Sequence, residues 1–116
     1  MNEARTGYFR LVQDEPPLYE YTVEPMPPSR LGRRWRWTLF RGDRLLAAGW
    51  RLSERAALHG IRTAAARAAY EAAGLRLLRP ERVWPDAGFR AGMTARLSAG
   101  DIACVLAPRD VALSAA

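Results

Sequence analysis

Apolar and polar residues alternate on both sides of a short turn near the middle of the chain. Over residues 34–40, every second residue is apolar and the residues between them are basic or polar, except at the end of the stretch. The segment that follows, Arg41-Gly42-Asp43-Arg44, has glycine and aspartate in its centre, as hairpin turns often do. Alternation resumes over residues 45–52. A period of two predicts β-strands, so we expect an antiparallel hairpin here.

This hairpin is expected to have one tryptophan-rich face and one arginine-bearing face. The tryptophan-rich face comprises Trp35, Trp37, Leu39, Leu46, Ala48, Trp50 and Leu52. The opposite face comprises Arg34, Arg36, Thr38, Leu45, Ala47, Gly49 and Arg51. An aromatic stripe of this kind is more often core than a ligand-binding surface, so we expect the tryptophan-rich face to be buried.

A long helix is expected directly after the hairpin, over about residues 53–73. Ser53 is a favourable N-cap, and Glu54 follows in the first turn, where the helix dipole favours an acid. The segment is rich in alanine and free of proline, and Gly74 suits a C-terminal cap. An apolar stripe recurs at helical spacing, at Leu58, Ile61, Ala65, Ala68 and Ala72. The predicted core packs three tryptophans against three helix residues: Trp35, Trp37 and Trp50 against Leu58, Ile61 and Ala65.

Strand patterns also flank this central unit. Residues 19–24 alternate between aromatic or β-branched residues and the polar residues Glu20, Thr22 and Glu24, which predicts a strand with one acidic face. Residues 93–98 also alternate, and a turn at 99–101 leads to the apolar run 102–107, which predicts a C-terminal hairpin. Short strands are also expected at 8–12 and 75–78. The predicted fold class is α+β: a small, mostly antiparallel sheet with one long helix packed on one face.

A chain of 116 residues suits one domain with a single hydrophobic core. We expect residues 1–116 to form that domain in three parts. An acidic N-terminal arm with strands spans 1–28, a basic hairpin plus helix spans 29–74, and C-terminal strands span 75–110.

The positive charge is concentrated in one segment. The formal net charge is +6 at pH 7, and residues 29–67 hold ten arginines and two acidic residues, whereas residues 1–28 hold two arginines and five acidic residues. The chain contains arginine but no lysine. Two explanations compete for this preference for arginine over lysine. One is codon bias in a GC-rich genome, and the other is that arginine's planar fork suits the recognition of phosphate and carboxylate. Under either explanation, the net charge favours acidic partners such as nucleic acid or an acidic protein surface.

The central segment resembles the YegP-like family of small bacterial proteins. The resemblance covers about residues 33–69: an Arg-Trp-Arg-Trp strand, a glycine turn, a second strand ending in an aromatic residue, and a serine-capped helix. The residues that carry it are Arg34-Trp35-Arg36-Trp37, Gly42, Leu46-Ala47, Trp50, Ser53, Ala57 and Gly60-Ile61. The resemblance implies a sheet-plus-helix fold and leaves function open.

The arginine-bearing face of the hairpin is the leading candidate for a binding surface. A flat arginine face with small residues can lie on a phosphate backbone. On the helix, Arg55, His59 and Arg62 lie at i, i+4 and i+7 beside the core stripe. The predicted nucleic-acid-binding residues are Arg34, Arg36, Arg51, Arg55 and Arg62. The alternatives are that these faces are merely solvated, or that the acidic arm covers the sheet face through Glu20 and Glu24.

A second hypothesis is a protein-interaction or assembly subunit that makes no nucleic-acid contact. Open hairpin edges can pair across a two-fold axis to form a homodimer. Trp84, beside Pro85, is a candidate partner-binding anchor, although tryptophan is more often core.

No sequence motif predicts catalysis, a metal or a cofactor. Phosphate-binding loops, dinucleotide fingerprints and nucleophile elbows are lacking, and the lone His59 has no ligand partner at a recognisable spacing. Cys104 is the single cysteine and lies in an apolar run, so we expect a buried core thiol and not a reactive one. Because no catalytic motif is present, we expect a protein without enzymatic activity. We also expect no signal peptide and no membrane span, and therefore a cytoplasmic location.

Overall fold

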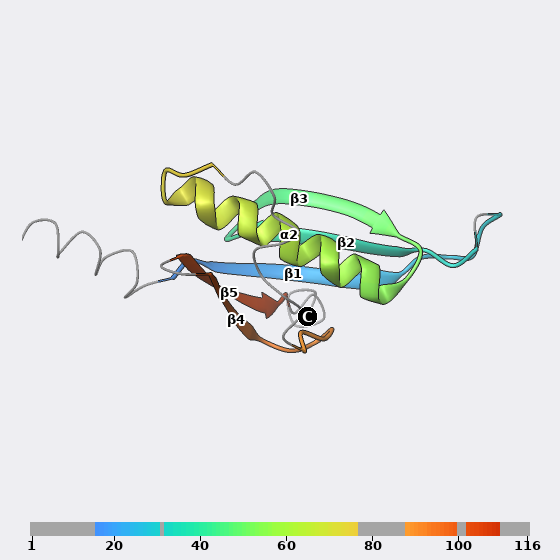
Figure 1. Ribbon diagram of the computed structural model, residues 1–116. Coiled ribbons are helices and arrows are strands. Elements are labelled where there is room, and N and C mark those ends of the chain that lie inside the picture. The colour runs from blue at the N-terminus through green and yellow to red at the C-terminus, as the bar shows by residue number, and fades with distance from the viewer. Residues whose placement is uncertain (1–15, 31, 77–87, 100–101, 110–116) are drawn as a thin grey trace, which may run out of the picture.

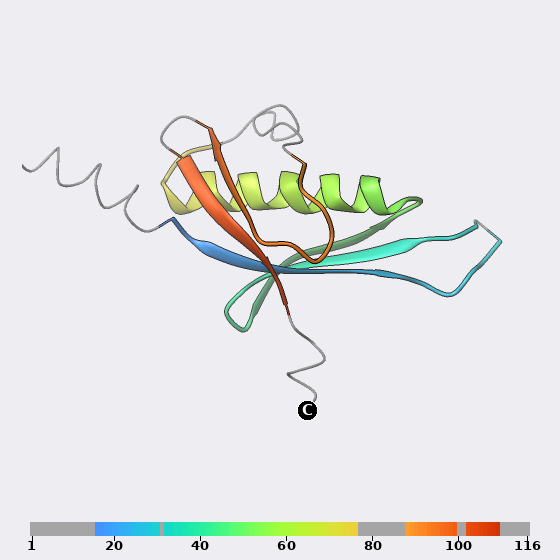
Figure 2. The ribbon, with the colours of Figure 1, turned by 90° about the horizontal axis from the view of Figure 1, so that it is seen from below.

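The computed structural model describes residues 16–30, 32–76, 88–99 and 102–109. One long helix packs on one face of a five-stranded sheet (Figures 1 and 2). The elements in chain order are β1 (Leu18–Pro25), β2 (Trp35–Arg41), β3 (Arg44–Arg51), α2 (Glu54–Ala72), β4 (Ala95–Ala99) and β5 (Ile102–Pro108). The strand order is β3-β2-β1-β5-β4, with β1 and β5 parallel and the other pairs antiparallel. The predicted α+β class and the long helix are confirmed.

The helix begins and ends where its sequence predicts. The Ser53 side chain accepts a hydrogen bond from the backbone N–H of Ala56 at 3.1 Å, which caps the first turn. Gly74 follows the last turn with φ +78°, a conformation that glycine adopts without strain. Leu58, Ile61 and Ala65 of the predicted stripe are buried, whereas Ala72 at its far end is exposed.

The core lies between α2 and the sheet. Its largest fully buried side chains come from β1, β2, α2 and β5: Tyr19, Tyr21, Leu39, Ile61, Leu106 and Cys104. Trp37 is 6% exposed and lies between two glycines, Gly49 of β3 and Gly60 of α2. A Cβ at either glycine would lie within 3.0 Å of the indole, so only glycine lets sheet and helix close on this ring.

A bulge in β3 reverses part of the predicted hairpin faces. Leu39 pairs with Ala47 and Phe40 pairs with Leu45, so Leu46 is an extra residue without a partner on β2. One extra residue moves every later side chain of β3 to the other face. Trp50 was predicted to be core but pairs with Arg36 and is 45% exposed on the face opposite α2. Arg51, predicted to lie beside Arg36, pairs with Trp35 instead.

Residues 18–25 of the predicted acidic arm form the central strand of the sheet, and residues 1–15 of that arm lie outside the described residues. β1 pairs with β2 along residues 20–25 and with β5 along residues 18–21. Glu24 is therefore the cross-strand partner of Arg36 and Glu20 that of Phe40, so these two glutamates belong to the sheet and do not form a separate layer over the arginines of β2. Leu75 and Arg76 are outside any strand, and the other residues of the strands predicted at 75–78 and 8–12 lie outside the described residues.

Candidate functional site

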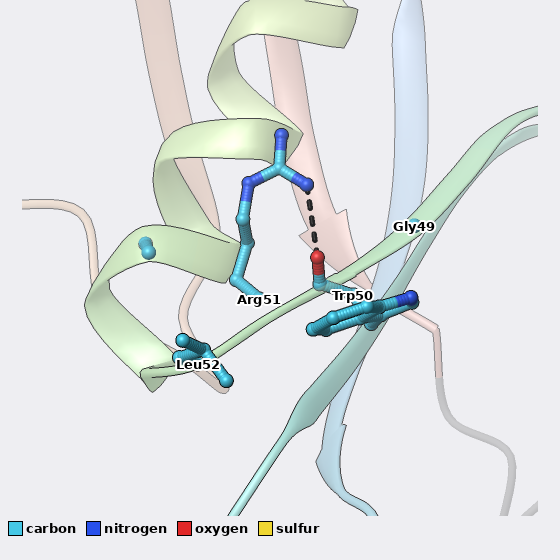
Figure 3. A pocket seen from close by; sticks show the side chains of 5 residues that line it. Gly49, Trp50, Arg51 and Leu52 are labelled. Carbon is cyan, nitrogen blue, oxygen red and sulfur yellow. Dashed lines mark hydrogen bonds between the residues drawn. The ribbon is translucent and has the colours of Figure 1, made fainter. Parts of the chain in front are cut away.

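The five predicted binding arginines are divided between two faces of the molecule. Arg36 lies on the sheet face opposite α2, together with Trp50, and the Arg34 guanidinium also reaches that ring. Arg55 and Arg62 belong to α2, on the other side of the sheet. Arg51 ends β3 and extends alongside α2, while Trp50 points away from the helix (Figure 3). Arg51 also donates from Nη1 to the Trp50 carbonyl oxygen at 2.9 Å.

An exposed aromatic ring flanked by two arginines is the most distinctive feature of the open sheet face. The Arg34 guanidinium carbon lies 5.7 Å from the centre of the Trp50 ring, within cation–π range. Arg36 is the cross-strand neighbour of Trp50 on β2. Among the described residues, neither arginine side chain has a hydrogen bond or ion pair, and the buried Nε of Arg34 lacks a partner. Both cations are therefore available to an outside anion.

In a second aromatic–arginine pair on the same face, protein acceptors hold the arginine over the ring. The Arg109 guanidinium carbon lies 4.1 Å from the centre of the Phe40 ring. Arg109 is held there by hydrogen bonds to the Gly42 carbonyl at 2.9 Å and to Glu20 Oε1 at 3.4 Å. Its Nη2 also lies 4.0 Å from an Asp43 carboxylate oxygen. Protein acceptors therefore hold this arginine in place, which is not the case for Arg34.

Carboxylates border the open arginines on one side. Glu24 of β1 is the cross-strand partner of Arg36, but no ion pair joins these two described residues. Two residues away on the same two strands, the hydroxyls of Thr22 and Thr38 hydrogen-bond to each other. The positive region of the open face is therefore confined to β2 and β3.

The β1–β2 ribbon continues past the N-terminal end of α2 as a protruding arm (Figures 1 and 2). The Met26 N–H donates to the Arg34 carbonyl at 2.8 Å, and Ser29 and Gly32 form a further bridge near the tip. Arg30 and Arg33 of this arm are exposed. The arm therefore extends the positive region beyond the body of the domain.

Two shallow depressions lie where β3 leads into α2. One has a volume of about 660 Å³ and is lined by Gly49, Trp50, Arg51, Leu52 and Ala56 (Figure 3). The other has a volume of about 420 Å³ and is lined by Ser53, Arg55, Ala56, His59 and Arg62. Within it, Arg62 Nη2 lies 3.2 Å from His59 Nδ1. Ala56 borders both, so the two depressions adjoin each other.

The start of β2, the end of β3 and the start of α2 meet at the end of the molecule that bears the arm (Figure 1). This basic end brings together six arginines, namely Arg30, Arg33, Arg34, Arg36, Arg51 and Arg55. Two glutamates, Glu24 and Glu54, belong to the same end. Such an excess of cations attracts polyanions and speeds their encounter with the surface.

The described residues hold no group of three or more metal-ligating side chains. Burial raises the pKa of the Cys104 thiol to about 12, which keeps it protonated near neutral pH. No helix within the described residues is long and apolar enough to cross a membrane. Trp84, the predicted partner anchor, lies outside the described residues.

The sequence alone places Trp50, like Arg51, on the wrong face of the sheet. The sequence feature that indicates the correct face for Trp50 is the pair Gly49 and Gly60. Glycine inside a strand and inside a helix indicates a close approach of the two backbones. Their shared neighbour is Trp37, which puts Gly49 on the helix side and hence Trp50 on the open side.

Comparison of the chain with protein-family models, curated proteins and solved structures gives no match. The YegP-like resemblance therefore stays a prediction, and the functional argument depends on the geometry of the chain itself.

Proposed function

We propose that this chain is a non-catalytic basic accessory protein of the cytoplasm that binds nucleic acid through its basic end. The observation that carries the proposal is the open sheet face, where Arg34 and Arg36 lie beside the exposed Trp50 without a hydrogen-bond or ion-pair partner among the described residues. Guanidinium groups pair with phosphate oxygens through two parallel hydrogen bonds. The arm adds Arg30 and Arg33, which extends the contact along a nucleic-acid backbone.

The proposal modifies the arginine set expected from the sequence. Arg34 and Arg36 form the centre of the proposed surface, while Arg51 ends β3 and Arg55 lies in the first turn of α2. Arg62, in the third turn of α2, contacts His59 in the second depression and belongs to the periphery.

Charge reversal at Arg36 tests this function. Arg36→Glu is expected to weaken binding to all nucleic-acid sequences about equally, by about tenfold, and to lower the salt slope, because phosphate contacts carry no sequence information. Arg67→Glu is the matched control, since it makes the same change of net charge at an exposed position of α2 away from the basic end. Equal affinities for the two variants would place the binding surface elsewhere. The thermal midpoints of both variants verify folding.

A second candidate function is an assembly subunit that pairs through the open edge of β3. β3 is the last strand of the described sheet and has no neighbour on its outer side. Leu45 and Leu52 are 53% and 63% exposed along or just beyond this strand. Unpaired strand edges with apolar residues favour strand addition. A homodimer in sedimentation equilibrium that Leu45→Lys dissociates would favour this candidate, whereas a monomer at high concentration would exclude self-pairing.

A further inference from the structure

Trp50 is a large aromatic residue that does not belong to the core formed by the described residues. The space between the sheet and α2 is filled by Trp37, and Trp50 lies on the opposite face with 45% of its surface exposed. Single exposed apolar residues are common on protein surfaces. This one is distinguished by its neighbours, because the Arg34 guanidinium lies over its ring, Arg36 is its cross-strand partner, and neither arginine is tied to a protein acceptor among the described residues.

The arginines over Phe40 and over Trp50 are held differently, and this difference leaves the Trp50 ring accessible to a ligand. Arg109 is held over Phe40 by hydrogen bonds to the Gly42 carbonyl and to Glu20, so a tied cation covers that ring. Arg34 lies farther from the Trp50 ring, and no described residue anchors it by a hydrogen bond or an ion pair. A flat ligand can therefore displace the Arg34 guanidinium from the Trp50 ring without breaking a hydrogen bond or ion pair between described residues.

A nucleotide base with its phosphates matches these groups. Bases stack on exposed aromatic rings whatever their sequence, while arginines bind the adjoining phosphates. Arg34 directly precedes β2, and Arg36 lies two residues farther along the chain, a spacing of about 7 Å in extended backbone. Their side chains therefore offer two separate positions for the phosphates that adjoin a stacked base.

The same geometry favours a single strand over a duplex. In a duplex the faces of the bases are stacked on each other and cannot reach Trp50. The positive region of this face is also narrow, because Glu24 borders it on β1 and Glu20 lies farther along the same strand. A single backbone fits on β2 and β3, whereas the second backbone of a duplex would approach these carboxylates.

We propose that single-stranded nucleic acid lies across β2 and β3 on the open sheet face, with one base stacked on Trp50 and the flanking phosphates bound by Arg34 and Arg36. This inference rests on the proposed function, and it adds the strandedness of the ligand and the stacking residue.

The test measures binding of the full chain to a labelled oligothymidylate of about 20 nucleotides, the matching oligouridylate and a duplex of similar length. The single strands are expected to bind more tightly than the duplex. Trp50→Ala is expected to lower single-strand affinity about five- to 100-fold, which is the loss of one stacked base, and to leave duplex binding unchanged. Trp50→Phe keeps an aromatic ring and is expected to retain most of the affinity. The ratio of the affinities for oligouridylate and for an oligodeoxyuridylate of the same length identifies the preferred sugar.

Fluorescence supplies a second readout that a change in folding does not reproduce. Stacking on Trp50 is expected to quench tryptophan emission at saturation, and Trp50→Phe is expected to lose most of that quenching while it still binds. The emission of the Trp50→Phe variant comes from the other three tryptophans and supplies the reference signal.

The outcomes separate the two proposals. If Arg36→Glu weakens binding while Trp50→Ala binds single strands like the unmodified chain, the nucleic-acid function stands and the stacking inference is overturned. If Trp50→Ala weakens single-strand and duplex binding equally, the single-strand assignment is overturned. If no probe binds at low salt, the proposed function itself fails.

Discussion

Gly49 of β3 is the cross-strand partner of Trp37 of β2, and a Cβ at residue 49 would lie 2.9 Å from the indole Nε1. Gly60 of α2 approaches the same indole from the helix side, where a Cβ would lie 3.0 Å away. The ring is therefore held between two backbones, and this contact sets the distance between the sheet and the helix.

The first prediction concerns Gly60. In an exposed helix interior, Gly→Ala stabilises a protein by about 1 kcal/mol. Here the added methyl meets the indole, so we expect Gly60→Ala to lower the free energy of unfolding by about 1–3 kcal/mol. Urea denaturation measures this. In a Trp37→Phe background the smaller ring leaves room, and the same substitution is expected to cost less or to stabilise. A gain in stability for Gly60→Ala in the unmodified chain would contradict the packing.

The second prediction concerns the Tyr21 hydroxyl. It donates to the Met93 carbonyl at 2.6 Å, and the Tyr21 ring meets Phe89 edge-on with centroids 5.1 Å apart. Tyr21→Phe keeps the ring contact and removes the hydrogen bond, so we expect a loss of about 1 kcal/mol in the free energy of unfolding. Faster amide exchange over residues 88–94 is expected as well. Tyr70→Phe is the control, because the Tyr70 hydroxyl makes no hydrogen bond with the described residues. Equal effects of the two substitutions would refute the role of this bond.

The third prediction concerns pH and Cys104. Burial raises the pKa of its thiol from 9.0 to about 12. The unfolded chain therefore loses this proton first as the pH rises, so the free energy of unfolding is unaffected by Cys104 below pH 9 and falls above it. Burial also raises the pKa of Tyr19 and of Tyr21 above 10.0, which adds to the fall at higher pH.

Urea denaturation at several pH values isolates the contribution of Cys104. Between pH 9 and 10, Cys104→Ala is expected to flatten the fall in stability by removing the contribution of the thiol, while the contribution of Tyr19 and Tyr21, whose unfolded-state pKa is 10.0, remains in both proteins. The native thiol is also expected to resist a thiol reagent at pH 8 until the protein unfolds. Parallel pH profiles for the variant and the unmodified chain would contradict the burial of this thiol.

The elements of this fold that depend on local sequence could be predicted. The helix follows from the Ser53 cap and an alanine-rich segment that ends at Gly74. β1 follows from the alternation of Tyr19 and Tyr21 with polar residues. In each case the pattern lies within a few residues, so neighbouring strands are not needed to interpret it.

The positions that depend on register could not be predicted. The bulge at Leu46 brings Gly49 opposite Trp37, and a period-two count through the turn misses it. The count therefore placed Trp50 in the core and Arg51 on the open face. The parallel pairing of β1 with β5 joins segments far apart in the chain, and no local pattern predicts it. The sequence therefore predicts a site of five arginines, whereas the structure brings two of them, Arg34 and Arg36, to the exposed Trp50 ring.

The most direct test of the account is a titration of the unmodified chain with a labelled single strand at two salt concentrations. If Arg30, Arg33, Arg34 and Arg36 each contact a phosphate, the slope of about −0.7 per contact predicts a roughly 50-fold loss of affinity between about 50 and 200 mM salt. That result would establish a surface on which several arginines contact phosphates. Binding that does not respond to salt, or no binding at the lower concentration, would contradict the account and direct attention to the open edge of β3.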